Sequence, residues 1–482
     1  MPESGRRPAR FVSPVLLAAL LTGFAAAQSP EPASAPAAAA PPAEKSASPT
    51  ATLTAPPSAQ PITFEASWKN GLTFQTKDKA FNWHVGGVVQ YDAAWYSASP
   101  NLQDFPDGTN RFPDGTAVRR GRIRSEGVMY SNVEFILELE FFNGFVPEGL
   151  DRTPATTSLP VSPTEAFVTL ADVPFLGHVR IGNQKEPYSL EHMNSARYLE
   201  FMERSFNFDA SPTSAFNNAR NPGICAFRTW CEERVWSSVG MFKTVGSTVA
   251  QPFGFGLGDG EYSVTGRITG LPVWKPDEQT YVSLGGAMSH RDPDDGRARF
   301  RVRDSVRSAP GPLLNTITST PILNADSIDL YNLESAAVYG RWTYAGEYQA
   351  IVVNGASVDK KPPLTGTPCF QGYYVEVLCF LTGESRPWDP KLSRFNRVIP
   401  KKNFGDDGWG AWELGVRYNT INLTDAGVTG GRLRDVTVGL NWYWNPNAKL
   451  QFNYDYTYRD RGTNPLAKGQ IHAFGTRLSY DF

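Results

Sequence analysis

Residues 133–141 read VEFILELEF, and the order of these side chains decides the fold. Every second residue is apolar, which gives one face made of Val133, Phe135, Leu137, Leu139 and Phe141. The opposite face carries Glu134, Ile136, Glu138 and Glu140. Side chains of a β-strand alternate between its two faces, so this strand has one apolar side and one charged side. Such a strand suits a wall between lipid and water, as in a transmembrane β-barrel.

The same alternation recurs along the chain. At 448–458, AKLQFNYDYTY places leucine, phenylalanine and tyrosines on one face and Gln451, Asn453, Asp455 and Thr457 on the other. The alternating stretches are 70–76, 82–96, 118–129, 133–141, 164–171, 176–184, 234–243, 261–269, 279–289, 327–338, 341–353, 371–381, 410–419, 434–444, 448–458 and 469–482. They predict an all-β, antiparallel transmembrane barrel of about sixteen strands. No run of about 18 apolar residues follows residue 27, which excludes spanning helices.

Segments rich in Gly, Pro, Asn and Asp separate these stretches, the longest at 97–117, 143–163, 186–232, 304–326 and 382–408. Long loops at one end and short turns at the other are typical of outer-membrane barrels, and we expect some loops to fold into the lumen. Aromatic residues make up 12% of the chain, and many lie near strand ends. They fit the two interfacial girdles of a barrel, but alone they fit the core of a soluble β protein equally well.

The last residues settle this choice. Leu478, Tyr480 and Phe482 share one face of a strand that ends on an aromatic residue. Outer-membrane barrels resemble this pattern closely, and their assembly machinery reads such a terminal segment. We therefore expect Phe482 to direct insertion into the outer membrane.

The N-terminus predicts export. Arg6, Arg7 and Arg10 precede an apolar stretch at 11–24, and three alanines follow at 25–27, so residues 1–27 read as a signal peptide. Residues 28–60 are dominated by Ala, Pro and Ser and predict a disordered linker, either a periplasmic tether or an unconstrained tail. The barrel then occupies residues 61–482.

Charge and motifs exclude several function classes. Without residues 1–27 the formal net charge is −4, which argues against a nucleic-acid partner. The enzyme motifs G-x-S-x-G, H-E-x-x-H and the P-loop are absent from the sequence, the five histidines are scattered, and we expect no catalysis, cofactor or metal.

Four cysteines form two pairs that are close in sequence, Cys225 with Cys231 and Cys369 with Cys379. In an exported protein such pairs predict two local disulfides, with buried free thiols as the alternative.

Several segments resemble the phosphate-selective porin O and P family from about residue 70 onward. They are RRGRIRSEG at 119–127, IGNQKEPYSLE at 181–191, ARNPG at 219–223, RFRVR at 299–303 and GLNWYWNPNAKLQFNY at 439–454. The resemblance implies a homotrimer of sixteen-stranded barrels, with inserted loops and a ladder of Arg and Lys that draws anions through. It singles out Lys185 and Arg220, although their neighbours Pro187 and Gly223 also suit plain turns. One departure is Gly86-Gly87-Val88-Val89-Gln90, where the family often has an arginine after the glycines, so one rung is missing.

Two arginine rows are the candidate pore lining. Arg120, Arg122 and Arg124 share a strand face at a spacing of about 7 Å, which would pass an oxyanion from one guanidinium to the next. Arg299, Arg301 and Arg303 repeat the device, together with Arg297. Either row could instead meet lipopolysaccharide phosphate at an exposed end, and other inward arginines could simply pair with inward glutamates.

Three hypotheses follow. The favoured one is an outer-membrane porin for small inorganic anions, phosphate first, because arginine matches its geometry. The second is a non-selective pore, motivated by the inward glutamates and the net charge of −4. The third is a structural or adhesive barrel, motivated by the long loops and the linker.

Overall fold

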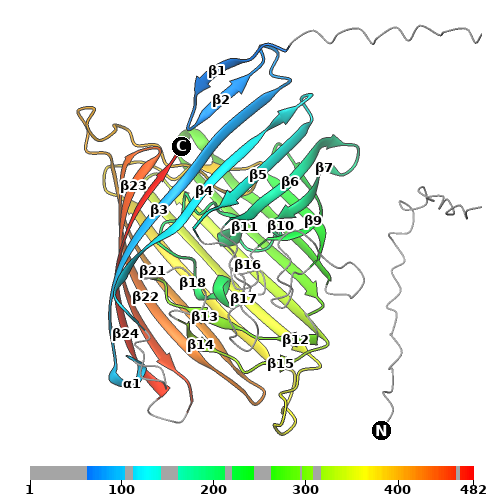
Figure 1. Ribbon diagram of the computed structural model, residues 1–482, viewed down its shortest axis with the longest axis vertical. Coiled ribbons are helices and arrows are strands. Elements are labelled where there is room, and N and C mark those ends of the chain that lie inside the picture. Colours follow the sequence, from blue (N-terminus) through cyan, green and yellow to red (C-terminus); the bar gives the residue numbers. More distant parts are fainter. Residues whose placement is uncertain are drawn as a thin grey trace, which may run out of the picture. The chain divides into compact units, whose positions relative to one another are not determined.

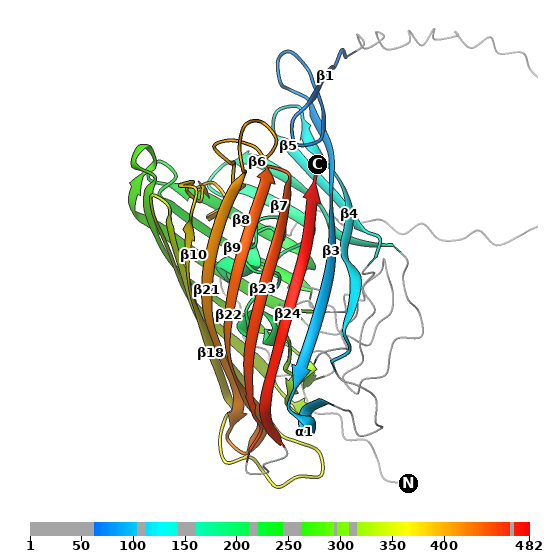
Figure 2. The same cartoon turned by 90° about the vertical axis from the view of Figure 1, so that its left-hand side faces the viewer.

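The computed structural model describes residues 62–103, 112–142, 161–211, 220–243, 262–293, 296–307, 316–462 and 467–482. The expected signal peptide at 1–27 and linker at 28–60 lie outside these residues. The described part forms one closed antiparallel β-barrel (Figures 1 and 2). No helix in the described ranges is long and apolar enough to cross a membrane.

Sixteen strands form the ring, and each pairs antiparallel with its neighbours. They are β3 (Asn82–Ala98), β4 (Gly115–Met129), β5 (Val133–Glu140), β6 (Ser162–Val173), β7 (Gly177–Gln184), β8 (Asn221–Trp230), β9 (Val235–Lys243), β10 (Tyr262–Lys275), β11 (Thr280–Arg291), β16 (Ser327–Tyr339), β17 (Trp342–Asn354), β18 (Cys369–Phe380), β21 (Ala411–Asp425), β22 (Val428–Asn445), β23 (Ala448–Asp460) and β24 (Lys468–Asp481). The ring closes where β24 pairs with β3. The barrel predicted from the period-two pattern is thereby confirmed.

The alternation has the predicted sense. Outward side chains such as Leu137 and Leu333 are 45% and 65% exposed, as expected for side chains that face lipid. Inward polar side chains such as Glu138 and Thr457 are buried. Water and inserted loops therefore lie on the polar side of the wall.

The closure depends on two glycines. The backbone N–H of Gly87 donates to the carbonyl oxygen of Phe482, and the N–H of Phe482 donates back to Gly87. A Cβ on Gly87 would lie 2.8 Å from the Phe482 ring, and one on Gly86 would lie 2.3 Å from the Phe482 carbonyl oxygen. Only glycine leaves room for the terminal residue to seal the ring.

The count of sixteen is right although one predicted strand lies outside the ring and one ring strand was missed. The stretch predicted at 70–76 contains β2 (Leu72–Gln75), which forms a hairpin with β1 (Glu65–Trp68). This hairpin pairs with the first residues of β3 and is not one of the ring strands. The missed ring strand is β8, which was placed inside a loop. Its inward residues include Cys225 and Phe227, so its two faces do not differ in polarity, and Pro222 stands near its start.

Three segments fold into the lumen. The β7–β8 segment carries α2 (Leu190–Met193) and α3 (Phe206–Ala210), and its described ends are 185–211 and 220. The β11–β16 segment carries β12 (Arg297–Ala298), β13 (Arg301–Arg303), β14 (Thr316–Ser319) and β15 (Leu323–Asn324). The β18–β21 segment carries β19 (Trp388–Asp389) and β20 (Arg394–Phe395). Short elements outside the lumen segments are α1 (Pro100–Gln103) and the 3-10 turn η2 (Pro276–Glu278).

Apolar packing holds the β11–β16 segment inside. Phe300, Val302 and Ile317 are buried together with wall residues such as Leu330 and Val353. Each such side chain contributes roughly 1.5–3 kcal/mol when it leaves water. This explains why a segment rich in arginine is nevertheless drawn into the barrel.

The β18–β21 segment lies at the end of the barrel where only short turns were expected. Strand order places residues 381–410 at the same end of the barrel as the short turns that join β4 to β5 and β22 to β23, near the C-terminus (Figure 1). The lumen is therefore entered by inserted chain from both ends of the barrel.

The disulfide prediction is contradicted by the structure, because all four cysteines have free thiols. Cys369 and Cys379 lie at opposite ends of β18, and ten residues of strand separate them by about 33 Å. Cys225 lies within β8, whereas Cys231 lies in the turn after it. A disulfide needs Cα atoms within about 7 Å, and an extended strand prevents that at these spacings.

Candidate functional site

The β7–β8 segment is tied to the barrel wall through its backbone. Lys449 donates from Nζ to the carbonyl oxygen of Leu199 (2.7 Å), and Asn441 donates to that of Glu200 (2.8 Å). Arg417 donates to the carbonyl oxygen of Glu203 (3.0 Å). Polar wall residues thereby satisfy backbone groups that would otherwise be buried without partners, which fixes the segment in the lumen.

A cavity of about 160 Å³ lies between this segment and strands β3–β6. It is lined by six cations and three carboxylates, namely Arg122, Arg124, Lys185, Arg197, Arg220, Arg394, Glu126, Glu138 and Glu165. Val88, Ser195, Ala196 and Tyr198 complete the lining. We call this space the lumen cavity, and its lining carries a formal excess of three positive charges.

Arg122 and Arg124 of β4 are held by carboxylates on the neighbouring strands. Arg122 donates from Nε to Glu140 (2.7 Å) and from Nη1 to Glu138 (3.1 Å). Arg124 reaches Glu165 (2.9 Å) from Nη1. Arg122 and Arg124 thus pair with inward glutamates, a pairing that the sequence suggested only for other inward arginines, and it orients both guanidiniums along the cavity.

Lys185 and Arg220 come from the two ends of the inserted segment. Lys185 donates from Nζ to the carbonyl oxygens of His192 (2.9 Å) and Asn194 (3.0 Å). Burial, with Arg204 and Arg220 nearby, lowers the pKa of Lys185 well below its ordinary value. Burial, followed by the charge of Arg122, also lowers the pKa of Arg220. Both shifts reflect positive charges crowded into a buried site.

The sequence did not single out Arg197 or Arg394 as cavity residues. Arg197 lies in the β7–β8 segment, 3.8 Å from Glu138, and Arg394 donates from β20 to the carbonyl oxygen of Met193 (3.3 Å). Insertion from opposite ends of the barrel brings them together, and no local spacing encodes that. At the position of the missing rung, Val88 adds an apolar side chain to the same cavity.

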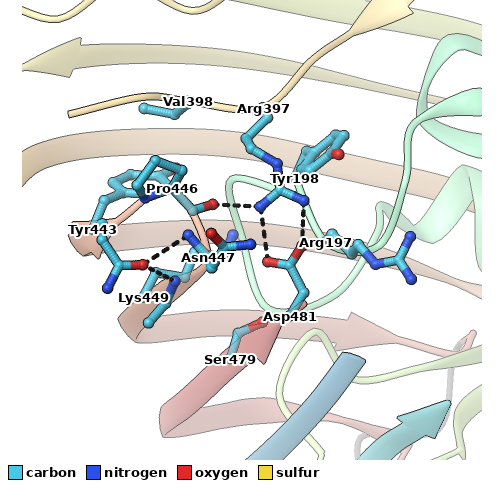
Figure 3. A pocket seen from close by; sticks show the side chains of 12 residues that line it. Arg197, Tyr198, Arg397, Val398, Tyr443, Pro446, Asn447, Lys449, Ser479 and Asp481 are labelled. Atoms are coloured by element: carbon cyan, nitrogen blue, oxygen red, sulfur yellow. Dashed lines mark hydrogen bonds and ion pairs between the residues drawn. The ribbon is translucent and has the colours of Figure 1, made fainter. Parts of the chain in front are cut away.

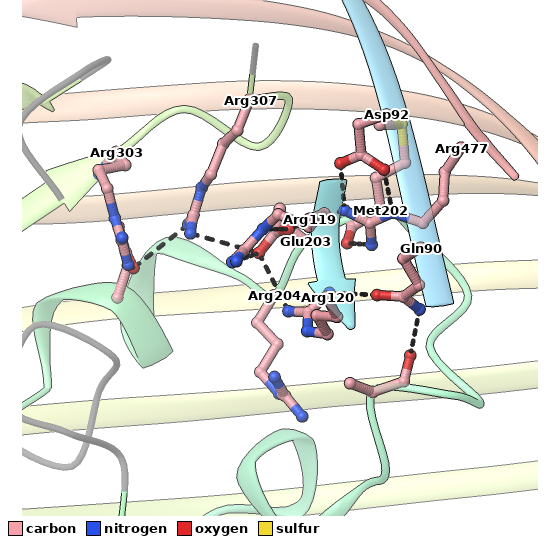
Figure 4. Close-up of polar contacts among 12 residues, drawn as sticks. Gln90, Asp92, Arg119, Arg120, Met202, Glu203, Arg204, Arg303, Arg307 and Arg477 are labelled. Atoms are coloured by element: carbon pink, nitrogen blue, oxygen red, sulfur yellow. Dashed lines mark hydrogen bonds and ion pairs between the residues drawn. The ribbon is translucent and has the colours of Figure 1, made fainter. Parts of the chain in front are cut away.

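Arg120 and Arg303 belong to a second group, which we call the Glu203 cluster. It consists of Asp92, Arg119, Arg120, Glu203, Asp209, Arg303, Arg307 and Arg477 (Figure 4). The register shifts between Gln90, which pairs with Arg120, and Tyr91, which pairs with Val118. Arg119 is thus the extra residue of a β-bulge, and the bulge lets two consecutive arginines reach the same carboxylate.

The second predicted row lies in the lumen, as one of its two interpretations required. Arg301 and Arg303 are 3% and 6% exposed, and Arg303 donates from Nη2 to Asp209 (2.6 Å). Arg299 donates to the Ser319 hydroxyl (3.4 Å). These arginines do not line the lumen cavity. Their role in conduction stays a prediction.

The β18–β21 segment is fastened at the short-turn end of the barrel. Arg397 forms an ion pair with Asp481 of β24 and donates to the carbonyl oxygen of Pro446 (2.5 Å), beside Tyr198 (Figure 3). Arg386 reaches Glu413 (2.6 Å) on the wall. These contacts position Arg394 at the lumen cavity.

Comparison with known proteins agrees with this architecture. A family model described as Phosphate-selective porin O and P matches residues 85–482. The chain belongs to this family. An uncharacterized protein of Caulobacter vibrioides is 30% identical to this porin over 463 residues, which cover 92% of this chain and 84% of the relative. Porin O of Pseudomonas aeruginosa is 22% identical over 443 residues, 86% and 91% of the two chains.

The outer membrane channel DcaP of Acinetobacter baumannii shares the fold of this porin. It covers 85% of this chain and 99% of its own with a TM-score of 0.50 at 10% identity. Family and fold together identify the porin as an outer-membrane channel. Within the described residues, no group of three or more His, Cys, Asp or Glu side chains could hold a metal ion.

Proposed function

We propose that this porin conducts small anions passively and favours them over cations at the lumen cavity, with phosphate and related oxyanions as its preferred solutes. One observation carries the proposal, namely that six cations and three carboxylates line one cavity. The chain as a whole gives no such bias, since its formal net charge is negative. Selectivity must therefore come from local placement of charge.

The size and chemistry of the cavity suit an oxyanion. A space of about 160 Å³ accommodates a small anion with a few waters. Five of the six cations are arginines, whose planar fork matches two oxygens of a phosphate or carboxylate. The cavity carboxylates Glu138 and Glu165 already occupy part of this hydrogen-bonding capacity.

Partial neutralisation favours permeation over trapping. A channel ion must bind strongly enough to enter and weakly enough to leave. Arg124 shares its guanidinium among Glu126, Glu138 and Glu165, so an entering anion competes with carboxylates for each donor. Several weakened sites would then pass the anion along, as a ladder does.

The reversal potential of single channels in a planar bilayer tests the proposal. Under a KCl gradient, the expected sign is that of chloride permeation, and replacing chloride by phosphate should retain this sign. A reversal potential of the potassium sign would overturn it. A value near zero would favour the second candidate, a non-selective diffusion pore, which the extensive pairing of Arg122 and Arg124 with glutamates supports.

We further propose that the chain is exported by residues 1–27, is inserted through Phe482 and assembles as a homotrimer in contact with lipopolysaccharide. Residues 1–27 have the sequence pattern of a signal peptide, Phe482 bonds to Gly87 where the ring closes, and membership of a porin family supports assembly in the outer membrane. Cross-linking of the porin in outer-membrane vesicles, read on a denaturing gel, should give a three-chain product. A single-chain band at saturating cross-linker would contradict the trimer.

A further inference from the structure

Glu203 of the β7–β8 segment is a carboxylate surrounded by guanidiniums. Arg119 donates to it from Nε (2.7 Å) and Arg477 from Nη2 (2.9 Å). Arg307 and Arg120 form ion pairs with it at 3.3 and 3.7 Å. Four arginines from β4, β24 and the β11–β16 segment thus converge on two oxygens (Figure 4).

This group is buried and unbalanced in charge. The Glu203 side chain is 4% exposed, and that of Arg477 is fully buried. The cluster holds five arginines and three carboxylates, because Asp92 pairs with Arg477 and Asp209 pairs with Arg303 and Arg307. Burial alone would raise the pKa of Glu203, but Arg119, Arg307 and Arg120 hold it well below its ordinary value.

The backbone, and not the carboxylate alone, determines where Glu203 lies. The carbonyl oxygen of Glu203 accepts from Arg417, and that of Met202 accepts from Arg477. Two residues further along the chain, the backbone N–H of Ser205 donates to Glu191 (2.8 Å). These contacts do not involve the Glu203 side chain and would persist after a change of it. Arg120, Arg307 and Arg477 also keep second partners in Gln90, Asp209 and Asp92, so these three guanidiniums would keep their places around the vacated space.

We propose that the side-chain carboxylate of Glu203 occupies an oxyanion site. When this side chain is removed, the site becomes a second binding site for small carboxylates and phosphate in the lumen. The four guanidiniums provide the charge and the donors, and Glu203 competes with solutes for them. The inference deepens the proposed function and rests on it for its physiological meaning. Glu203 then limits anion binding to the lumen cavity.

Acetate rescue of Glu203→Ala tests this proposal on the full-length porin in detergent. Acetate reproduces the carboxylate and the carbon that the substitution removes. The melting temperature of the variant should rise with each tenfold increase in acetate, at constant ionic strength made up with bulky gluconate, since a ligand of the folded state stabilises it. No rise would overturn the proposal.

Two matched variants make the result specific. Glu203→Gln fills the space with a neutral amide and should show no acetate response. Glu334→Ala removes a buried carboxylate held by the guanidinium of Arg267, and should respond much less. Equal responses in Glu334→Ala and Glu203→Ala would show a general salt effect and would also overturn the site.

A second measurement covers the case in which Glu203→Ala does not fold in either salt. Glu203→Ser also vacates the space but keeps a small polar side chain whose hydroxyl can accept from a guanidinium, and its cluster gains one net positive charge. The phosphate concentration that half-saturates its conductance should fall about tenfold, the affinity gained from about one charge-assisted hydrogen bond. An unchanged value would overturn the proposal, whereas failure of the proposed function would appear in the wild-type reversal potential.

Discussion

Removing Arg122 and Arg124 together should abolish most of the proposed anion preference. The double variant Arg122→Ala/Arg124→Ala leaves four cations and three carboxylates in the lining of the lumen cavity, so the excess of three positive charges falls to one. The neighbouring Glu138 and Glu165 also lose their closest guanidiniums, at 3.1 and 2.9 Å. Both effects make the cavity less attractive to an anion.

Coulomb's law sets the size of this effect. A unit charge about 7 Å from the ion contributes about 0.6 kcal/mol in water and about 2.4 kcal/mol at an effective dielectric constant of 20. Each arginine then changes anion occupancy by about 3-fold to about 60-fold. The ratio of chloride to potassium permeability should therefore fall at least about 8-fold in the double variant, if the two contributions add.

The assay is the reversal potential under a KCl gradient, with heat-modifiable gel mobility to verify folding. Lys275→Ala/Lys391→Ala is the matched control, because it also removes two positive charges, from side chains that are 57% and 73% exposed, one at the last residue of β10 and the other in the turn between β19 and β20. Only the arginine variant should shift. An unshifted reversal potential in a folded Arg122→Ala/Arg124→Ala barrel would refute the assignment of the cavity as the selectivity site.

Three further outcomes are expected. Arg397→Ala removes the ion pair with Asp481, and should loosen the β18–β21 segment, increase single-channel conductance and speed proteolysis between 381 and 410; unchanged conductance and cleavage would refute the fastening role. Burial, with the neighbouring Asp435, raises the pKa of Asp304 to about 7 from 3.8, so the folded state binds this proton more tightly. The stabilisation that this proton provides should be present at acidic pH and lost as pH rises toward 7. Asp304→Asn should therefore remove this pH dependence of the melting temperature, and a pH dependence identical to that of the wild type would contradict the assignment. Finally, thiol titration of unreduced, denatured protein should find four free cysteines per chain, and two or none would restore a disulfide.

The barrel is predictable from the sequence because alternation is a local property. The nine residues VEFILELEF are enough to predict which side chains of β5 face outward and which face inward, and Phe482 marks the closing strand. Where the inward face is not polar, the signal fails. In β8, Phe227 turns inward and packs under the guanidinium of Arg180 (4.9 Å), so the strand shows no contrast between its faces.

The site was predictable only in part, because it is assembled from distant segments. The row of Arg122 and Arg124 follows from spacing along one strand. Arg394 reaches the cavity because residues 381–410 fold in from the short-turn end, against the expected loop arrangement. Glu203 gave no sequence signal, since its importance comes from arginines as distant as Arg119 and Arg477 and from a bulge in β4.

Phosphate titration of single-channel chloride conductance is the most direct test of the lumen cavity as an anion-binding constriction. If one cavity with six cations binds either anion, as we propose, added phosphate should reduce the chloride current along a saturating curve. The same titration of Arg122→Ala/Arg124→Ala should require more phosphate. A chloride current that phosphate leaves unchanged at every concentration would contradict the account.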